Sequence, residues 1–469
     1  MVQTISALFF TTPFLLALLV PLAGITWVVA GARSALLWVS LYLGCILYFP
    51  NASWGLIDRS DGSDFYNRAT GTFFFSAINV LLFGLVLQAL VGRAWGRLPP
   101  LRHNLRLAAI LFWLILLGNV LLGSYLDDVY WYQIIGYSGL LNVANFMLGF
   151  YVFMACVNSP KDLDRLITVL LFCAVTRGLW GVFRFVALGG DPANVYANFQ
   201  NLDIKLTFFD INDSLIATLA MFVAAWRLVN VKSLSVSAKC MYAAIIALEL
   251  FIIFFSYRRT AWGGIALAAV LFAFCQTRGL RNSLLVVYAT VGLPALLYKF
   301  TLRSGTSGQS VSFLERILPD VAQGRSFSLT TGRFAELYAA GLSIKESPWL
   351  GLGAWGKYDG SRFSELAWHR GDYGWMHSGV LHIALKSGAI GVAITVFVFF
   401  GLCRYVWRHR DSVPPAQRGI MMAGVAGVLF MLPNWLIGTP VIEYRTMQLM
   451  ALCFALPYMA IAVAHQPKG

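Results

Sequence analysis

The chain has 469 residues, of which 59% are hydrophobic and 12% are charged, and its mean hydropathy is +0.71. Soluble domains carry about 25% charged residues, and a soluble core of this size cannot hide so much apolar surface. Apolar runs of about 20 residues recur along the chain, and each is long enough to cross a bilayer. These features exclude a soluble enzyme, a secreted disulfide scaffold and a disordered chain, and they predict an all-α polytopic membrane protein.

The apolar runs predict about 12–14 transmembrane helices, since Pro13 and Pro21 can split the first run. The predicted spans are roughly 7–30, 34–50, 70–92, 107–124, 134–156, 166–188, 212–229, 240–256, 260–277, 282–300, 377–402, 420–437 and 446–464. The chain then divides into a bundle of about ten spans over 1–300, a hydrophilic segment over 301–376 and three C-terminal spans over 377–469.

The net charge of +14 is explained by membrane topology and does not indicate nucleic-acid binding. Lysine and arginine cluster at the ends of spans, in 93–106, 227–239, 278–281 and 403–418. Short cytoplasmic loops carry such an excess of cations, so these loops are predicted to lie inside. The segment 301–376 is then predicted to lie outside.

This outside segment is the only long hydrophilic stretch of the sequence. A short helix is predicted around 311–318, stopped by Pro319, and a second helix over about 332–345, before Pro348. The apolar positions of the second helix are Phe334, Leu337, Leu342 and Ile344. Long loops with structure of their own usually form lids or binding elements, which is the role predicted for this segment.

Ionisable side chains inside predicted spans are costly, so each one is a candidate functional residue. Arg177 and Arg184 lie seven residues apart and share one helix face. Glu249 and Lys386 lie within two other spans. The structural alternative is that Glu249 pairs with Arg177 or Lys386 and serves only assembly.

The tandem Arg258–Arg259 and His377 lie at the outer ends of spans. Planar guanidinium groups suit phosphate oxygens, so the tandem predicts a phosphate-bearing substrate; the alternative is that it anchors lipid headgroups. The imidazole of His377 suits a general base, the alternative being an ordinary interfacial residue. His382 lies on another face of the same helix and is predicted to pack.

No metal or other cofactor is predicted. The seven cysteines all lie in or at the edges of apolar spans, without the spacing of a zinc site or a disulfide framework. The outer loops hold no carboxylate cluster arranged like a metal site, and Asp127–Asp128 stands far from the other motifs in the sequence.

Four stretches resemble, in the right order, motifs of the bacterial O-antigen ligase and polysaccharide polymerase superfamily. Residues 377–391, HSGVLHIALKSGAIG, resemble its His-[Asn/Ser/Gln]-x9-Gly-x-x-Gly signature. Residues 332–355, GRFAELYAAGLSIKESPWLGLGAW, are similar to its arginine, amphipathic helix and Pro-x-x-Gly-x-Gly turn. Residues 256–262, SYRRTAW, resemble its Ser-x-Ser-Arg-Gly-Ala-Trp stretch, and 208–212, FFDIN, its Gly-Thr-Phe-x-x-x-Asn motif.

The resemblance implies a glycosyltransferase of the GT-C type in the bacterial inner membrane, active at the periplasmic face. Its donor would be a glycan on undecaprenyl diphosphate, transferred en bloc to an acceptor sugar or hydroxyl on lipid A–core or another glycan. Membrane lipids would be further partners of the protein. His377 would deprotonate the acceptor hydroxyl, and Arg259 would stabilise the leaving diphosphate. Arg258 replaces the second serine of the motif, and alignment on Arg-x-Ala-Trp assigns the family arginine to Arg259. Substrate binding is expected from Arg258, Arg184, Arg333 and Lys205.

The identity of the acceptor is not decided by these motifs. A ligase passes the glycan to lipid A–core, a polymerase passes it to another lipid-linked repeat unit, and a protein O-oligosaccharyltransferase passes it to pilin; all three share the donor chemistry. Outside the enzyme class, a flippase for lipid-linked oligosaccharides would also use intramembrane arginines. Transporters favour repeat-related halves with midplane sites, whereas here the candidates gather near the outer surface, which favours the enzyme.

Overall fold

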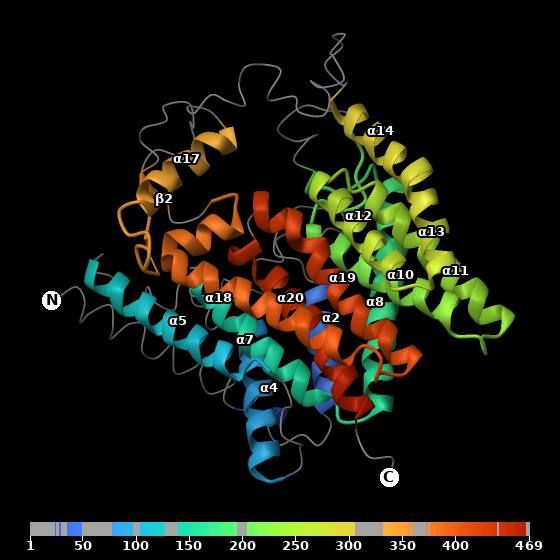
Figure 1. The fold of residues 1–469 in the computed structure, drawn as a ribbon, viewed down its shortest axis with the longest axis horizontal. Coiled ribbons are helices and arrows are strands. Elements are labelled where there is room, and N and C mark those ends of the chain that lie inside the picture. Colours follow the sequence, from blue (N-terminus) through green and yellow to red (C-terminus); the bar gives the residue numbers. More distant parts are fainter. Residues whose placement is uncertain are drawn as a thin grey trace.

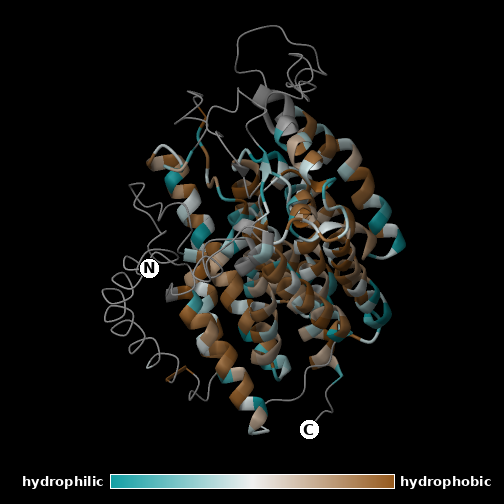
Figure 2. Cartoon of the chain, turned by 90° about the vertical axis from the view of Figure 1, so that its left-hand side faces the viewer, coloured by the Kyte–Doolittle hydropathy of each residue, from teal (hydrophilic) through white to brown (hydrophobic). Residues whose placement is uncertain are grey.

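The structure is a computed structural model that describes residues 24, 28–29, 35–48, 77–96, 104–126, 139–194, 204–304, 332–354, 356–359, 372–373, 376–438 and 440–465. In this part of the chain it is a bundle of long helices with one small β-ribbon (Figure 1). Apolar residues cover the helices along their length, while hydrophilic residues lie mainly at helix ends and in loops (Figure 2). This distribution is the one expected of helices whose surroundings are lipid.

The first six helices are α2 (Ala35–Tyr48), α4 (Ala77–Ala94), α5 (Arg106–Leu126), α7 (Gly139–Cys156), α8 (Pro160–Ala187) and α10 (Ile211–Asn230). They are followed by α11 (Val236–Phe254), α12 (Arg259–Phe274), α13 (Arg278–Val287), the π-helical η2 (Tyr288–Gly292), α14 (Leu293–Ser304) and α17 (Gly332–Ile344). The antiparallel strands β1 (Tyr358–Asp359) and β2 (Asp372–Tyr373) precede α18 (Gly379–His409), α19 (Pro415–Ile437), η4 (Pro440–Ile442) and α20 (Tyr444–Ala464).

Among the described residues, eight helices are long and apolar enough to span a membrane, and four shorter helices are apolar as well. The predicted class, an all-α multi-pass membrane protein, is therefore confirmed. The predicted spans from 34–50 to 446–464 each coincide with a helix, and 282–300 coincides with α13, η2 and α14 together. The first predicted span, 7–30, lies almost wholly outside the described residues, as does the predicted helix 311–318.

Helix α8 begins at Pro160, earlier than the apolar run that predicted a start at 166. Ser159 caps it, since its side-chain oxygen accepts a hydrogen bond from the main-chain N–H of Asp162 at 3.1 Å. Proline is favoured in the first turn because its missing N–H has no partner to lose there. Capping residues thus extend the helix beyond its apolar part, which hydropathy alone does not register.

Helices α19 and α20 form the centre of the bundle, and nearly all of α20 is buried. Small residues let neighbouring helices approach closely, as membrane helices require. A Cβ added to Gly427 would lie 2.5 Å from Sγ of Cys453, and one added to Gly264 would meet the main-chain oxygen of Phe430. Helices α8, α10, α11 and α12 lie on one side of this centre, and α4, α5, α7 and α18 on the other (Figure 1).

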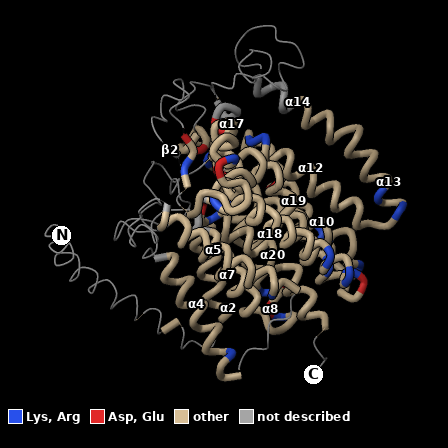
Figure 3. Tube along the Cα trace, turned by 60° about the vertical axis from the view of Figure 1, so that its left-hand side comes forward, with Lys and Arg blue, Asp and Glu red and all other residues tan. Residues whose placement is uncertain are grey.

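Lysine and arginine lie mainly at helix ends, and the middle of the bundle is largely uncharged (Figure 3). The described charged side chains that are nevertheless buried include Arg177, Arg184, Asp191, Asp213, Glu249, Glu336, Lys386 and Arg445. A buried charge needs a partner, because its desolvation costs several kcal/mol. The contacts of these side chains therefore indicate which of them serve the packing of the bundle.

Candidate active site

The end of α19 brings two of the sequence motifs together. A Cβ added to Gly263 of α12 would lie 3.3 Å from Cγ of Pro433 in α19. A Cβ added to Gly379 of α18 would lie 2.5 Å from Cε3 of Trp435, two residues further along α19. The starts of α12 and α18 therefore flank one helix end. The arginine side is the flank formed by loop 204–210 and the turn 255–259. The histidine side is the flank formed by α17, residues 347–358 and the start of α18.

His377 lies immediately before α18 on the histidine side. Ser378 caps this helix, because its side-chain oxygen accepts a hydrogen bond from the main-chain N–H of Leu381 at 3.3 Å. The imidazole of His377 is 31% exposed, and its Nδ1 lies 2.8 Å from Oε2 of Glu336. The main-chain N–H of His377 donates to Oε1 of the same carboxylate at 3.1 Å. The histidine is thus fixed by its helix on one side and by a carboxylate on the other.

Glu336 is the functional candidate that sequence reasoning missed. It lies on α17 with its side chain 4% exposed, and it also accepts a hydrogen bond from the hydroxyl of Tyr358 at 3.3 Å. The described buried positions of α17 are Glu336, Ala339, Ala340 and Ser343, a helical stripe of small and polar residues. Of the apolar positions noted in the sequence, Leu337, Leu342 and Ile344 are half-buried, and Ile344 packs against the small core beside Ala340. The available signal was a carboxylate within a stripe of small residues.

The turn 347–354 inserts its main chain into a break in α18 at Gly388. Gly388 has φ +62° and ψ −161°, a conformation that only glycine adopts readily. The freed N–H groups of Ala389 and Ile390 donate to the carbonyls of Pro348 and Trp349 at 2.8 and 3.3 Å. In return, the main-chain N–H groups of Leu352 and Gly353 in the turn donate to the carbonyls of Leu385 and Lys386. The glycine signature and the Pro-x-x-Gly-x-Gly turn therefore form one interlocked unit.

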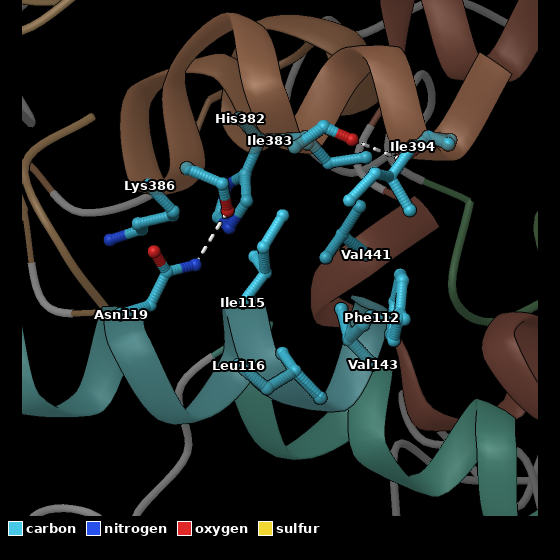
Figure 4. A pocket seen from close by; sticks show the side chains of 13 residues that line it. Phe112, Ile115, Leu116, Asn119, Val143, His382, Ile383, Lys386, Ile394 and Val441 are labelled. Atoms are coloured by element: carbon cyan, nitrogen blue, oxygen red, sulfur yellow. Dashed lines mark hydrogen bonds between the residues drawn. The ribbon is translucent and has the colours of Figure 1, made fainter. Parts of the chain in front are cut away.

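A small cavity of about 50 Å³ lies beside this unit, between α5, α7, α18 and η4 (Figure 4). Nδ2 of Asn119 donates to Oγ of Ser387 at 2.6 Å, and Nζ of Lys386 donates to the carbonyl of Gly356 at 2.7 Å. The structural alternative in which Lys386 pairs with Glu249 is therefore not the arrangement found. His382 is 3% exposed and lines the cavity, in agreement with the packing role predicted for it.

Loop 204–210 crosses the arginine side and contacts several candidate residues. The main-chain N–H of Thr207 donates to the carbonyl of Phe255 at 3.1 Å, which ties the loop to the arginine tandem. The ring of Phe208 lies under the guanidinium groups of Arg177 and Arg184, and the ring of Phe209 lies 4.3 Å from Cζ of Arg258. Lys205 lies exposed on the same loop.

Aspartates neutralise the deeper arginines. Arg184 pairs with Asp191, which also accepts from the main-chain N–H of Phe209 at 2.7 Å. Arg177 donates to Asp213 at 2.6 Å, so the structural alternative that pairs it with Glu249 is not the arrangement found, although Arg177 does form an interior ion pair. The remaining contacts join Arg445 to Asp210 at 2.6 Å and to Asp213 at 3.1 Å. Sequence reasoning missed these aspartates and Arg445, since nothing in their local pattern indicates a partner on another helix.

The turn before α12 holds the two arginines in a constrained backbone. Tyr257 has φ +54°, a left-handed conformation that costs a non-glycine residue about 1–3 kcal/mol. Oγ of Ser256 donates to the carbonyl of Ile253 at 2.8 Å, and Nε1 of Trp262 donates to the same carbonyl at 3.2 Å. Such strain is characteristic of functional sites, where the surrounding packing imposes it.

An apolar cavity of about 650 Å³ lies between α4, α5, α7, α18, α19 and α20. Its lining includes Val380, three residues after His377, and Trp435 at the end of α19; at the other end of the helices it includes Leu90 and Leu105. A cavity of this shape and polarity suits a hydrocarbon chain.

Within the described ranges, no three His, Cys, Asp or Glu side chains are grouped as a metal site would require. Asp127–Asp128 lies outside those ranges, as does the side chain of Arg333, although α17 itself starts at 332.

Comparison with protein families gives one match for this chain. Residues 242–396 match the family described as O-antigen ligase. The matched segment runs from α11 into α18 and contains Arg258, Arg259, Glu336 and His377. A search of curated proteins finds no match.

Proposed function

Residues 242–396 carry an O-antigen ligase family domain within a multi-pass membrane protein, and on that premise we propose a specific glycosyltransferase activity. The protein transfers a glycan en bloc from undecaprenyl diphosphate to an acceptor hydroxyl, in lipopolysaccharide or surface polysaccharide biosynthesis. One observation carries this proposal: a carboxylate-bound histidine and an arginine tandem flank the same end of α19.

The reaction needs a base and a cationic site for the leaving group. In our proposal the acceptor O–H gives its proton to His377 as its oxygen bonds to the anomeric carbon of the donor. The bond from that carbon to the diphosphate oxygen breaks, and the electron pair leaves with the diphosphate. Arg259 stabilises the developing charge with its planar fork of N–H donors, assisted by Arg258, Lys205 and Arg333. Arg184, paired with Asp191, holds loop 204–210 in place for these contacts.

A lipid-linked donor or acceptor also needs a place for its chain. The apolar cavity of about 650 Å³ reaches Val380, close in sequence to His377. An isoprenoid or acyl chain buried there would gain about 25 cal/mol for each Å² of apolar surface removed from water. The cavity therefore supports a substrate with a hydrocarbon chain.

The reacting face is proposed to be the periplasmic one, on a bacterial inner membrane. The support is the cation asymmetry of the short loops, which assigns 93–106 and 403–418 to the cytoplasm. Single cysteines at Ser307 and Ser412, in a background without reactive native thiols, test this assignment. An impermeant maleimide applied to spheroplasts is expected to label the first and spare the second; the reverse pattern would overturn the topology.

The acceptor distinguishes a ligase from the two related transferase activities. A polymerase would use a second lipid-linked glycan, and a protein O-oligosaccharyltransferase would use a pilin hydroxyl. The ligase is the form we propose, since the matching family is described as O-antigen ligase. A flippase is disfavoured because the candidate residues gather at one end of the bundle, whereas transporters bind near the midplane.

The proposal is tested with the full-length protein in nanodiscs. The purified protein receives undecaprenyl-diphosphate-linked glycan together with lipid A–core, a second lipid-linked glycan or a pilin peptide, each in a separate reaction. Glycan transfer to lipid A–core, persisting in EDTA, is the expected result. Transfer only to one of the other acceptors would replace the ligase by that activity. Donor translocation without any transfer would contradict the enzyme.

A further inference from the structure

The carboxylate of Glu336 contacts His377 at two points. Oε2 lies 2.8 Å from Nδ1 of the ring, and Oε1 accepts from the main-chain N–H at 3.1 Å. The hydroxyl of Tyr358 donates to Oε1 at 3.3 Å. The carboxylate is nearly buried, whereas the imidazole is about one third exposed.

This arrangement fixes which ring nitrogen carries the proton. An ionised carboxylate is only an acceptor, so Nδ1 must donate its hydrogen to Oε2. In the neutral ring, Nε2 is then left with its lone pair and without a proton, as a base requires. The contact with the main-chain N–H prevents the carboxylate from rotating away, because both oxygens are engaged.

The histidine side is built to hold this pair rigidly. Ala339 and Ala340 of α17 pack with Tyr358, Met376 and Leu385 in a small apolar core of their own. The interlocked turn 347–354 joins this core to α18 through main-chain hydrogen bonds. Helix α17 and the start of α18 therefore form one unit, and the carboxylate and the ring are positioned before any substrate binds.

We propose, building on the transferase activity proposed above, that Glu336 is the positioning residue of His377. It holds the ring in the Nδ1–H tautomer and stabilises the imidazolium that forms when Nε2 takes the proton of the acceptor hydroxyl. Glu336 itself remains ionised and exchanges no proton with the substrate. The acceptor hydroxyl must therefore approach Nε2.

Replacing Glu336 by glutamine tests this role sharply. In Glu336→Gln, the main-chain N–H of His377 still needs an acceptor, which the amide oxygen supplies. The amide NH₂ then faces Nδ1 and favours the opposite tautomer, with the proton on Nε2. Glycan transfer is expected to fall at least about 100-fold in kcat, with KM for the donor little changed. Glu346→Gln, an exposed carboxylate just beyond α17, is the matched control and should transfer at the wild-type rate.

A measurement without substrate separates this inference from the transferase proposal. Nitrogen NMR of ¹⁵N-histidine-labelled protein, with His377→Ala to assign the signal, reports which ring nitrogen carries hydrogen. The expected result is Nδ1–H in the wild type and Nε2–H in Glu336→Gln. An Nε2–H signal in the wild type, or full transfer by Glu336→Gln, would overturn the positioning role. A wild type with the Nδ1–H tautomer that transfers no glycan would instead contradict the proposed function.

Discussion

The two flanks of α19 treat their charged residues differently. On the arginine side, Arg177, Arg184 and Arg445 lie in the interior and are each neutralised by an aspartate. On the histidine side, a single carboxylate binds a base that is about one third exposed. Main-chain hydrogen bonds and a small apolar core make up the other contacts described on this side. The arginine side is held together by charge pairs, and the histidine side by backbone geometry.

On this difference rests our proposal of different roles for arginines that look alike in the sequence: structural for the paired ones, chemical for the tandem. The paired arginines join helices α2, α8, α10 and α20, because Arg445 also donates to the carbonyls of Ile46 and Leu47. The arginines of the tandem lie at the start of α12, directly after the strained Tyr257. An intramembrane charge is therefore not by itself evidence of catalysis, because an ion pair with another side chain can give it a purely structural role.

The largest expected effect is on stability and concerns Asp213. Asp213→Ala leaves Arg177 and Arg445 without their shared carboxylate in the interior. Breaking a buried ion pair in this way costs about 3–5 kcal/mol. Thermal unfolding in detergent is expected to show a large loss of stability, whereas Asp411→Ala, with a side chain 81% exposed, should leave it unchanged. Equal stability of the two variants would show that the charge pairs do not hold this side together.

The next effect is on catalysis and concerns Arg259. Arg259→Lys keeps the charge and loses the planar fork, so transition-state stabilisation should fall by about 2.7–4 kcal/mol, or about 10²–10³ in rate. Single-turnover transfer measures this, with Arg278→Lys at the exposed start of α13 as the control. Wild-type rates for both Arg259→Ala and Arg258→Ala would reduce the tandem to a headgroup anchor.

A smaller effect is expected at the glycine break of the histidine side. Gly388→Ala places a Cβ 2.2 Å from the main-chain carbon of Trp349, so the turn must shift away from α18. The unfavourable backbone conformation alone costs about 1–3 kcal/mol in addition. Limited proteolysis should then cleave the segment 347–354 faster, with transfer reduced in parallel. Gly118→Ala in α5, where no atom lies within 4 Å of the new Cβ, is the matched control. Unchanged proteolysis of Gly388→Ala would show that the turn does not depend on the break.

Hydropathy predicted the helices well, because crossing a bilayer requires long apolar runs whatever the partners. It failed where polar residues extend a helix, as at Ser159 before α8. His377 and the arginine tandem could be singled out because their positions at span ends are visible in the sequence. Glu336, Asp191 and Asp213 could not, since their roles arise from contacts between separate segments, which local periodicity does not encode.

The most direct test of the account is glycan transfer by His377→Ala in nanodiscs. His382→Ala, a buried histidine of the same helix outside the proposed chemistry, is the control. The account predicts that His377→Ala stays folded and binds the lipid-linked donor, while its transfer rate falls by about 10²–10⁴ and that of His382→Ala stays near the wild-type value. A folded His377→Ala protein that transfers glycan at the wild-type rate would contradict it.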